Sequence, residues 1–72
     1  MKKLKKIKIR INGKIKTIID KLTLYQLIND LKIPIKKVAI ELNKEIINKS
    51  KIKKKKLKNG DVIEIVHFIG GG

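Results

Sequence analysis

Apolar and basic residues alternate at the start of the chain. Isoleucines occupy every second position from Ile7 to Ile11, and Lys or Arg fills the positions between them. Such alternation is typical of a strand with one buried face. Asn12 and Gly13 follow, and this dipeptide favours a type I′ turn, because that turn requires positive φ at both central residues. With a returning strand over residues 14–19, the sequence predicts an N-terminal β-hairpin.

A short amphipathic helix is predicted next. Thr23 and Gln26 have the spacing of a capping box, in which each side chain bonds a backbone amide at the start of a helix. Apolar residues then recur at i, i+3, i+4 and i+7, namely Leu24, Leu27, Ile28 and Leu31. Pro34 is expected to end the helix, since the residue before a proline is disfavoured in helical geometry. A helix of about two to three turns is unstable alone, so it must pack on the hairpin.

The second half of the chain returns to alternation. Residues 38–42 predict a third strand, Asn43 and Lys44 a turn, and residues 45–47 a short fourth strand. Residues 50–58 are interpreted as a loop, Asp61 as part of a turn, and residues 62–68 as the last strand. The connection between the second and third strands is long enough to allow their parallel pairing. The expected fold class is α+β, a roll in which a mixed sheet of four to five strands packs on one short helix.

The length and composition limit the kinds of function. The 72 residues suffice for one domain, expected over residues 1–69, with residues 70–72 as a flexible glycine tail. Zero cysteine excludes disulfides and thiolate nucleophiles, and a single histidine leaves no expected metal site and no expected catalytic residue. No apolar run approaches the roughly 20 residues of a membrane-spanning helix, so a cytoplasmic protein is expected.

The charge of the chain suggests nucleic acid at first. Twenty basic side chains stand against six acidic ones, giving a net charge of +14. Six of the lysines form a cluster: Lys51, Lys53, Lys54, Lys55, Lys56 and Lys58. However, Tyr25 and Phe68 are the only aromatic residues, so there is no stacking platform for bases, and nucleic acid is not an expected partner. We interpret the cluster as a solvated loop, whose field can still steer the chain toward acidic partner surfaces.

The last three residues, Gly70, Gly71 and Gly72, are the most distinctive feature. Glycine packs no side chain, so the tail adds nothing to a core and offers a slim backbone with a terminal carboxylate. On composition alone, a frayed chain end remains an alternative.

The residues before the glycines decide between these interpretations. The run from Val62 to Phe68, followed by the glycines, resembles the C-terminus of the ThiS family, the sulfur carrier proteins of thiamine biosynthesis. The resemblance extends to the turn at residues 58–61, the segment 38–47, the Asn12–Gly13 hairpin and the small helix. The lysine density between residues 50 and 58 is the clearest departure.

The resemblance implies a β-grasp fold, as in ubiquitin, and a carrier that is not an enzyme. An E1-like adenylyltransferase of the ThiF type would use ATP to adenylate Gly72, while Gly70 and Gly71 thread its active site. A sulfur donor such as a cysteine desulfurase relay would then form a thiocarboxylate, and thiazole synthase (the ThiG type) would accept the sulfur. The chain itself would bind no cofactor.

The last strand also suggests a docking surface. If Glu64 faces outward, then Val62, Val66 and Phe68 share its side of the strand, and Ile69 follows them. An exposed apolar stripe beside the tail would suit docking of both enzymes. The alternative is that a neighbouring element covers these residues or that the alternation is broken.

Three other functions remain at this stage. The small subunit of molybdopterin synthase shares the implied fold and glycine end, but typically carries proline ahead of the glycines, where this chain has residues 66–69. A ubiquitin-like modifier would use the same chemistry. A small basic RNA-binding module would make the tail incidental, and its binding would fall steeply with salt.

Overall fold

The computed structural model describes residues 5–68 of the chain. The expected boundary between domain and tail, at residues 69 and 70, therefore lies outside the described residues, as do Ile69, Gly70, Gly71 and Gly72.

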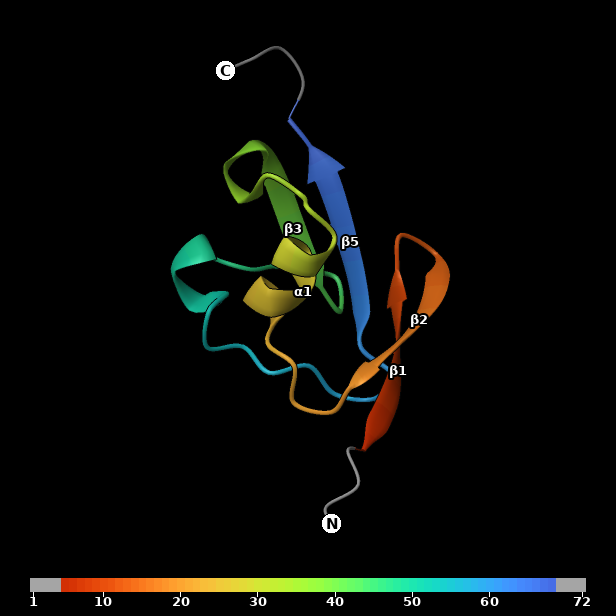
Figure 1. Ribbon diagram of the computed structural model, residues 1–72. Coiled ribbons are helices and arrows are strands. Elements are labelled where there is room, and N and C mark those ends of the chain that lie inside the picture. The colour runs from red at the N-terminus through yellow and green to blue at the C-terminus, as the bar shows by residue number, and fades with distance from the viewer. Residues whose placement is uncertain (1–4, 69–72) are drawn as a thin grey trace.

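One mixed sheet and one short α-helix form the fold (Figure 1). In chain order the elements are β1 (Lys6–Ile11), β2 (Lys14–Ile19), α1 (Leu24–Asp30), the 3₁₀ helix η1 (Ile35–Lys37), β3 (Val38–Leu42), β4 (Glu45–Ile46), the 3₁₀ helix η2 (Lys49–Lys51) and β5 (Val62–His67). The five strands lie in the order β2-β1-β5-β3-β4, which confirms the predicted α+β roll and places the last strand at the centre.

The two turns predicted between paired strands, at residues 12–13 and 43–44, are present. Asn12 and Gly13 have φ values of 46° and 83°, as a type I′ turn requires, and β1 pairs with β2 along its whole length. Asn43 and Lys44 repeat this geometry, with φ values of 52° and 70°, between β3 and β4. Asparagine tolerates the left-handed region better than most residues, so it serves as the first residue of both turns.

The parallel pairing occurs between different strands from those expected. β2 and β3 do not pair, because β1 and β5 lie between them, and the parallel pair is β1 with β5. The crossover through α1 thus spans the width of two strands, and the last strand fills the gap that it leaves. β5 can occupy this interior position because Ile63 and Ile65 are buried against the core.

The start of α1 follows the prediction. The Gln26 amide donates to Thr23 Oγ1 over 3.1 Å, and the Thr23 amide donates to Gln26 Oε1 over 3.0 Å, which completes the capping box. Leu24, Leu27 and Ile28 are buried, so this face of the helix packs on the sheet.

The end of α1 differs from the prediction, because the helix stops at Asp30 and not at Pro34. The Lys32 amide donates to Asn29 O over 2.9 Å, the Ile33 amide donates to Ile28 O over 3.1 Å, and Lys32 has a φ of 58°. This is the Schellman pattern, which usually places glycine where Lys32 stands. Pro34 instead caps the start of η1.

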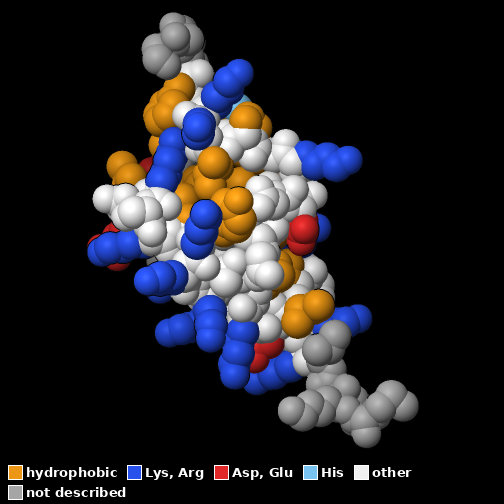
Figure 2. All heavy atoms as spheres, turned by 60° about the vertical axis from the view of Figure 1, so that its left-hand side comes forward, with side chains coloured by type: hydrophobic (Ala, Val, Ile, Leu, Met, Phe, Trp, Pro, Cys, Tyr) orange, Lys and Arg blue, Asp and Glu red, His pale blue; other side chains and the backbone are white. Residues whose placement is uncertain are grey.

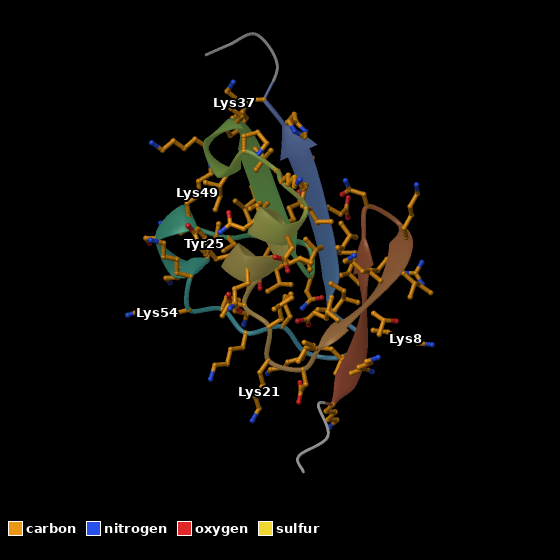
Figure 3. All side chains as sticks on the ribbon, in the orientation of Figure 1. Lys8, Lys21, Tyr25, Lys37, Lys49 and Lys54 are labelled. Carbon is orange, nitrogen blue, oxygen red and sulfur yellow. The ribbon has the colours of Figure 1, made fainter. Side chains whose placement is uncertain are left out.

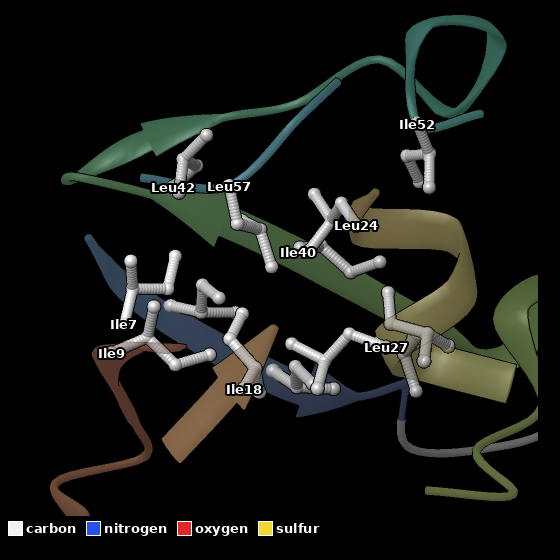
Figure 4. Close-up of a cluster of buried hydrophobic side chains, with 13 residues drawn as sticks. Ile7, Ile9, Ile18, Leu24, Leu27, Ile40, Leu42, Ile52 and Leu57 are labelled. Carbon is white, nitrogen blue, oxygen red and sulfur yellow. The ribbon is translucent and has the colours of Figure 1, made fainter. Parts of the chain in front are cut away.

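The core lies between α1 and one face of the sheet (Figure 4). Residues 50–58 are not the simple solvated loop that their charge predicted, because part of this segment belongs to the core. That segment begins within η2, and its two apolar residues, Ile52 and Leu57, are almost completely buried. Lys56 forms an isolated bridge with Thr23. Two buried anchors therefore hold the basic segment against the helix side of the molecule.

Candidate functional site at the end of the last strand

β5 carries the chain from the middle of the sheet toward its C-terminal residues. It pairs in parallel with β1 and antiparallel with β3, where Val38 lies opposite His67. Because strands flank it on both sides, its backbone position is fixed by the sheet. Phe68 is the last residue that the structure describes, so the geometry of the site is that of the platform from which residues 69–72 continue.

The asparagines of the two type I′ turns both bond to β5. Asn12 Oδ1 accepts a hydrogen bond from the Ile65 amide at 2.8 Å, and Asn12 Nδ2 donates to Ile65 O over 3.3 Å. Asn43 Oδ1 accepts from the Val62 amide at 2.9 Å, while the Asn43 amide donates to Val62 O over 2.7 Å. Asn12 thus bonds β5 through its side chain at both the amide and the carbonyl of Ile65, and Asn43 bonds it once through its side chain and once through its backbone amide.

Asp61 secures the entry into β5. This carboxylate is buried and accepts hydrogen bonds from the Lys58 amide, at 2.8 Å, and from Asn43 Nδ2, at 3.1 Å. A carboxylate that bonds the amide three residues before it closes a turn, which agrees with the role expected for Asp61.

The predicted docking stripe has the expected alternation. Ile63 and Ile65 are buried, and Glu64 between them is exposed. Val62 is half-buried, while Val66 and Phe68 are 57% and 55% exposed. Val66 and Phe68 are therefore exposed to solvent in the described part of the chain. The alternative that a neighbouring element covers them is wrong for these two residues.

The exposed apolar surface is wider than β5. Ile15 and Ile46 are 65% and 75% exposed. The strand register places them on the same side of the sheet as Val66, because Arg10 is opposite both Ile15 and Val62, and Glu41 is opposite both Ile46 and Glu64. The outer sheet face, which α1 does not cover, is therefore partly apolar. Sequence alternation on β5 alone could not find this, because it depends on the pairing register.

Phe68 has two basic neighbours that the sequence did not indicate. Its amide donates to Lys37 O over 2.9 Å, and Lys49 Nζ lies 5.2 Å from the centre of its ring. Figure 3 shows Lys37 beside the upper end of β5 and Lys49 at η2, to the left of the strand. A lysine over an aromatic ring at this distance makes a cation–π contact. No spacing signal predicts this, since the three residues come from three separate elements.

The basic surface extends over the helix side of the molecule. Figure 2 shows many Lys and Arg side chains around an apolar patch on this side, with few acidic ones. Lys53 Nζ lies 5.2 Å from the centre of the Tyr25 ring, so both aromatic rings of the chain, Tyr25 and Phe68, face one of its own lysines.

A catalytic or metal centre is not apparent within residues 5–68. No group of three or more His, Cys, Asp or Glu side chains that could hold a metal ion occurs there. His67 is exposed at the end of β5. Across the same described range, every helix is too short or too polar to cross a membrane.

Comparison with known proteins gives a consistent result. The ThiS family model matches residues 9–72. The chain is 50% identical over 56 residues to the sulfur carrier protein ThiS of Bacillus subtilis (strain 168), a match that covers 78% of this chain and 76% of that protein. It is also 39% identical over 66 residues to a thiazole synthase of Paramagnetospirillum magneticum, a match that covers 92% of this chain but only 20% of that longer protein.

Solved structures support the same family. The crystal structure of the thiamine biosynthesis protein ThiS from Geobacter metallireducens is similar with a TM-score of 0.81 and 30% identity, over 92% of this chain and all of that one. The solution structure of a thiamine biosynthesis protein from the same organism gives a TM-score of 0.73 at 30% identity, over 92% of this chain and 88% of that one. The five-stranded mixed sheet with one helix is thus the β-grasp fold that the resemblance implied. The chain belongs to the ThiS family of sulfur carrier proteins of thiamine biosynthesis, and it is a carrier and not an enzyme.

Proposed function

We propose that the carboxyl group of Gly72 is the site that carries sulfur, and that thiazole synthase receives it. The observation that carries this proposal is the extent of the family match, which runs through residue 72 and so includes all three terminal glycines. The similarity of nearly the whole chain to one fifth of a thiazole synthase supports the choice of acceptor, because it links such a domain to that enzyme.

The chemistry follows from the poor reactivity of a carboxylate toward nucleophiles. A carboxylate oxygen of Gly72 attacks the α-phosphorus of ATP, pyrophosphate leaves, and an acyl adenylate forms. The terminal sulfur of a donor persulfide then attacks the carbonyl carbon and AMP leaves, which gives an acyl disulfide. A thiol of the donor cleaves its S–S bond, so that the thiocarboxylate is released and the donor is left as a disulfide. The activating enzyme, an E1-like adenylyltransferase of the ThiF type, binds the ATP, and a cysteine desulfurase relay supplies the sulfur. The cytoplasm, where ATP is available, is the proposed compartment.

Gly70 and Gly71 serve this chemistry through their lack of side chains. An active site that must enclose an acyl adenylate and exclude water leaves little width for the incoming chain, and glycine needs the least. The four residues after Phe68 can span at most about 13 to 14 Å when extended. Gly72 therefore acts at a distance from the sheet, and the partner enzymes must approach the end of β5 closely.

The apolar stripe of β5 is the proposed docking surface for that approach. Val66 and Phe68 are more than half exposed, Val62 is half-buried, and Ile69 continues the chain from them. Apolar surface exposed beside a reacting group gains free energy when a partner covers it, and this positions the tail at the same time.

An intact-mass measurement tests the proposal. The chain, with no C-terminal tag, is incubated with ATP, a ThiF-type enzyme and a sulfur donor, and we expect one oxygen to be replaced by one sulfur. The sulfur carrier protein ThiS of Bacillus subtilis serves as the positive control that the enzyme is competent. Deletion of Gly72 is expected to abolish the gain, whereas deletion of Met1, the matched truncation at the other end, leaves it unchanged. A competent enzyme that modifies the control but not this chain would contradict the proposal.

A further inference from the structure

Two basic segments that are distant in sequence meet at Phe68. η1 ends with Lys36 and Lys37, and the carbonyl of Lys37 accepts the Phe68 amide. η2 begins with Lys49, whose ammonium lies 5.2 Å from the centre of the Phe68 ring. The last described residue before the tail thus contacts one lysine of each segment, one through its backbone and one through its side chain.

The charge around this point has a single sign along both segments. Residues 31–40 contain three lysines and no acidic residue, and residues 46–60 contain seven lysines and no acidic residue. Lys37 and Lys49 are exposed, and Figure 3 shows them on the same side of the upper end of β5. We call these two residues the tail-base lysines.

We propose that the tail-base lysines bind an acidic surface of the adenylating enzyme, at the point where that enzyme receives the tail. This inference rests on the function proposed above and names a contact that the apolar stripe does not provide. The partner is identified by chemistry alone: it presents carboxylates that face the two ammonium groups beside Phe68, where the glycine tail begins.

The chemistry at Gly72 favours such a contact with the adenylating enzyme in particular. The attacking carboxylate and the phosphates of ATP are both negative, so their approach is opposed electrostatically. The tail-base lysines offset this opposition only weakly, because up to four residues separate them from Gly72, and their direct contacts are with acidic residues outside the nucleotide site. Complementary charges at the edge of an interface mainly raise the association rate, and salt screens them.

A local contact must be separated from the general attraction that a net charge of +14 exerts on any acidic protein. Lys21 and Lys54 make this possible, because Figure 3 shows both farther from the end of β5 than the tail-base lysines. Both are exposed, so their replacement removes the same charge from other parts of the surface.

The test compares two double variants in the adenylation reaction, measured as kcat/KM for the carrier by ATP–pyrophosphate exchange. Lys37→Gln with Lys49→Gln is expected to lower kcat/KM about 3- to 30-fold at low ionic strength, the range for losing two edge contacts. Lys21→Gln with Lys54→Gln is expected to lower it by no more than about twofold. The difference between the two pairs should shrink as salt is added.

A third double variant, Lys37→Arg with Lys49→Arg, keeps both charges and the cation contact with the Phe68 ring. It is expected to retain the wild-type kcat/KM, which separates loss of charge from disturbance of Phe68. Thermal unfolding of each variant establishes that the fold is retained.

The possible results are distinct. Equal losses in the two glutamine pairs would overturn the inference and leave only a long-range field, and a loss in the arginine pair would assign the effect to packing. A defect confined to binding of thiazole synthase would overturn the choice of partner. If wild-type chain is not adenylated at all, the proposed function itself fails, and this is seen before any variant is made.

Discussion

The two ends of β5 differ in how they are held. At its start, Asp61 closes the preceding turn, and the side chain of Asn43 bonds the Val62 amide. At its end, Val66 and Phe68 are more than half exposed, and Phe68 makes one backbone hydrogen bond and one cation–π contact. One strand of six residues therefore begins among side-chain hydrogen bonds centred on the buried Asp61 and ends with exposed apolar side chains.

This difference places the residues that hold β5 in the fold at the start of the strand and the residues that a partner can reach at its end. A carrier must give its last residues to an enzyme without losing its fold, so the reacting group has to lie beyond the packed region. β5 is anchored by its interior position between β1 and β3. The hydrogen bonds of Asp61 and Asn43 at its start hold the strand in place when a partner binds its end. In the proposed function a larger protein is not needed, because the partner enzymes supply the catalytic groups.

The largest effect on stability is expected at the buried start of the strand. Ile63 is completely buried, and Ile63→Ala would leave a cavity between the sheet and the helix. We expect a loss of about 2 to 5 kcal/mol in the free energy of unfolding, which for so small a domain approaches its whole stability. Chemical denaturation followed by circular dichroism measures it.

The matched control is Val66→Ala, on the other side of the same strand. Because Val66 is 57% exposed, its truncation is expected to change the free energy of unfolding by less than about 0.5 kcal/mol. Similar losses for the two variants would mean that both faces of β5 are buried, and the exposure of the outer face at Val66 would be wrong.

The next largest effect is expected at Asn12. Asn12→Ala removes the hydrogen bonds to both the amide and the carbonyl of Ile65, and it places alanine at a φ of 46°. We expect a loss of about 1 to 3 kcal/mol in the free energy of unfolding, from the unpaired backbone groups and the strained turn. Urea denaturation measures the change.

Asn12→Gly separates these two causes. Glycine adopts positive φ without strain but has no amide to bond Ile65, so it isolates the contribution of the hydrogen bonds. If Asn12→Gly is as stable as the wild type, the turn conformation alone matters, and the Asn12 side chain does not anchor β5.

Much of this architecture could be predicted from local patterns. Alternation indicated the strands, the Asn12–Gly13 pair indicated the first turn, and the spacing of Thr23 and Gln26 indicated the start of the helix. Each of these signals arises from residues that are neighbours in sequence, and each is confirmed by the structure. The exposure of Val66 and Phe68 was also predictable, because it follows from strand periodicity.

The features that the sequence did not indicate depend on distant contacts. Pairing of β1 with β5 joins the two ends of the chain, and Asn12 bonds a residue 53 positions away. The helix end was missed because Lys32 adopts a left-handed conformation that usually marks glycine. The burial of Ile52 and Leu57 was hidden by the lysines around them. The assignment of Gly72 came from resemblance to a family, since three glycines alone specify no chemistry.

A smaller effect, on binding and not on folding, is expected at the end of the strand. Phe68→Ala removes an exposed ring, so the free energy of unfolding is expected to change by less than about 1 kcal/mol. Binding to thiazole synthase is expected to weaken by about 1 to 2 kcal/mol, as truncation of an aromatic interface residue commonly does. Titration calorimetry measures the affinity, and an unchanged value would remove the apolar stripe as a docking surface for this partner.

The smallest effect is expected midway along β5, where Glu64 lies directly opposite Glu41 on the outer face of the sheet. Like charges in this position destabilise a sheet, and Glu64→Lys replaces the repulsion with an attraction. We expect the free energy of unfolding to rise by about 0.3 to 1 kcal/mol, with the gain declining as salt is added. Denaturation at low and high ionic strength measures both quantities.

Glu64→Gln is the matched control for this last variant, because it removes the repulsion without adding an attraction, and it should give about half of the gain. A gain that does not respond to salt would exclude the electrostatic cause. The same two variants also locate the boundary between the two ends of β5. If they gain stability and keep their affinity for thiazole synthase, Glu64 belongs to the anchored part of the strand. If they gain stability but lose affinity, the docking surface extends from Phe68 back at least to Glu64. The unfavourable pair of Glu41 and Glu64 then lies where the partner binds.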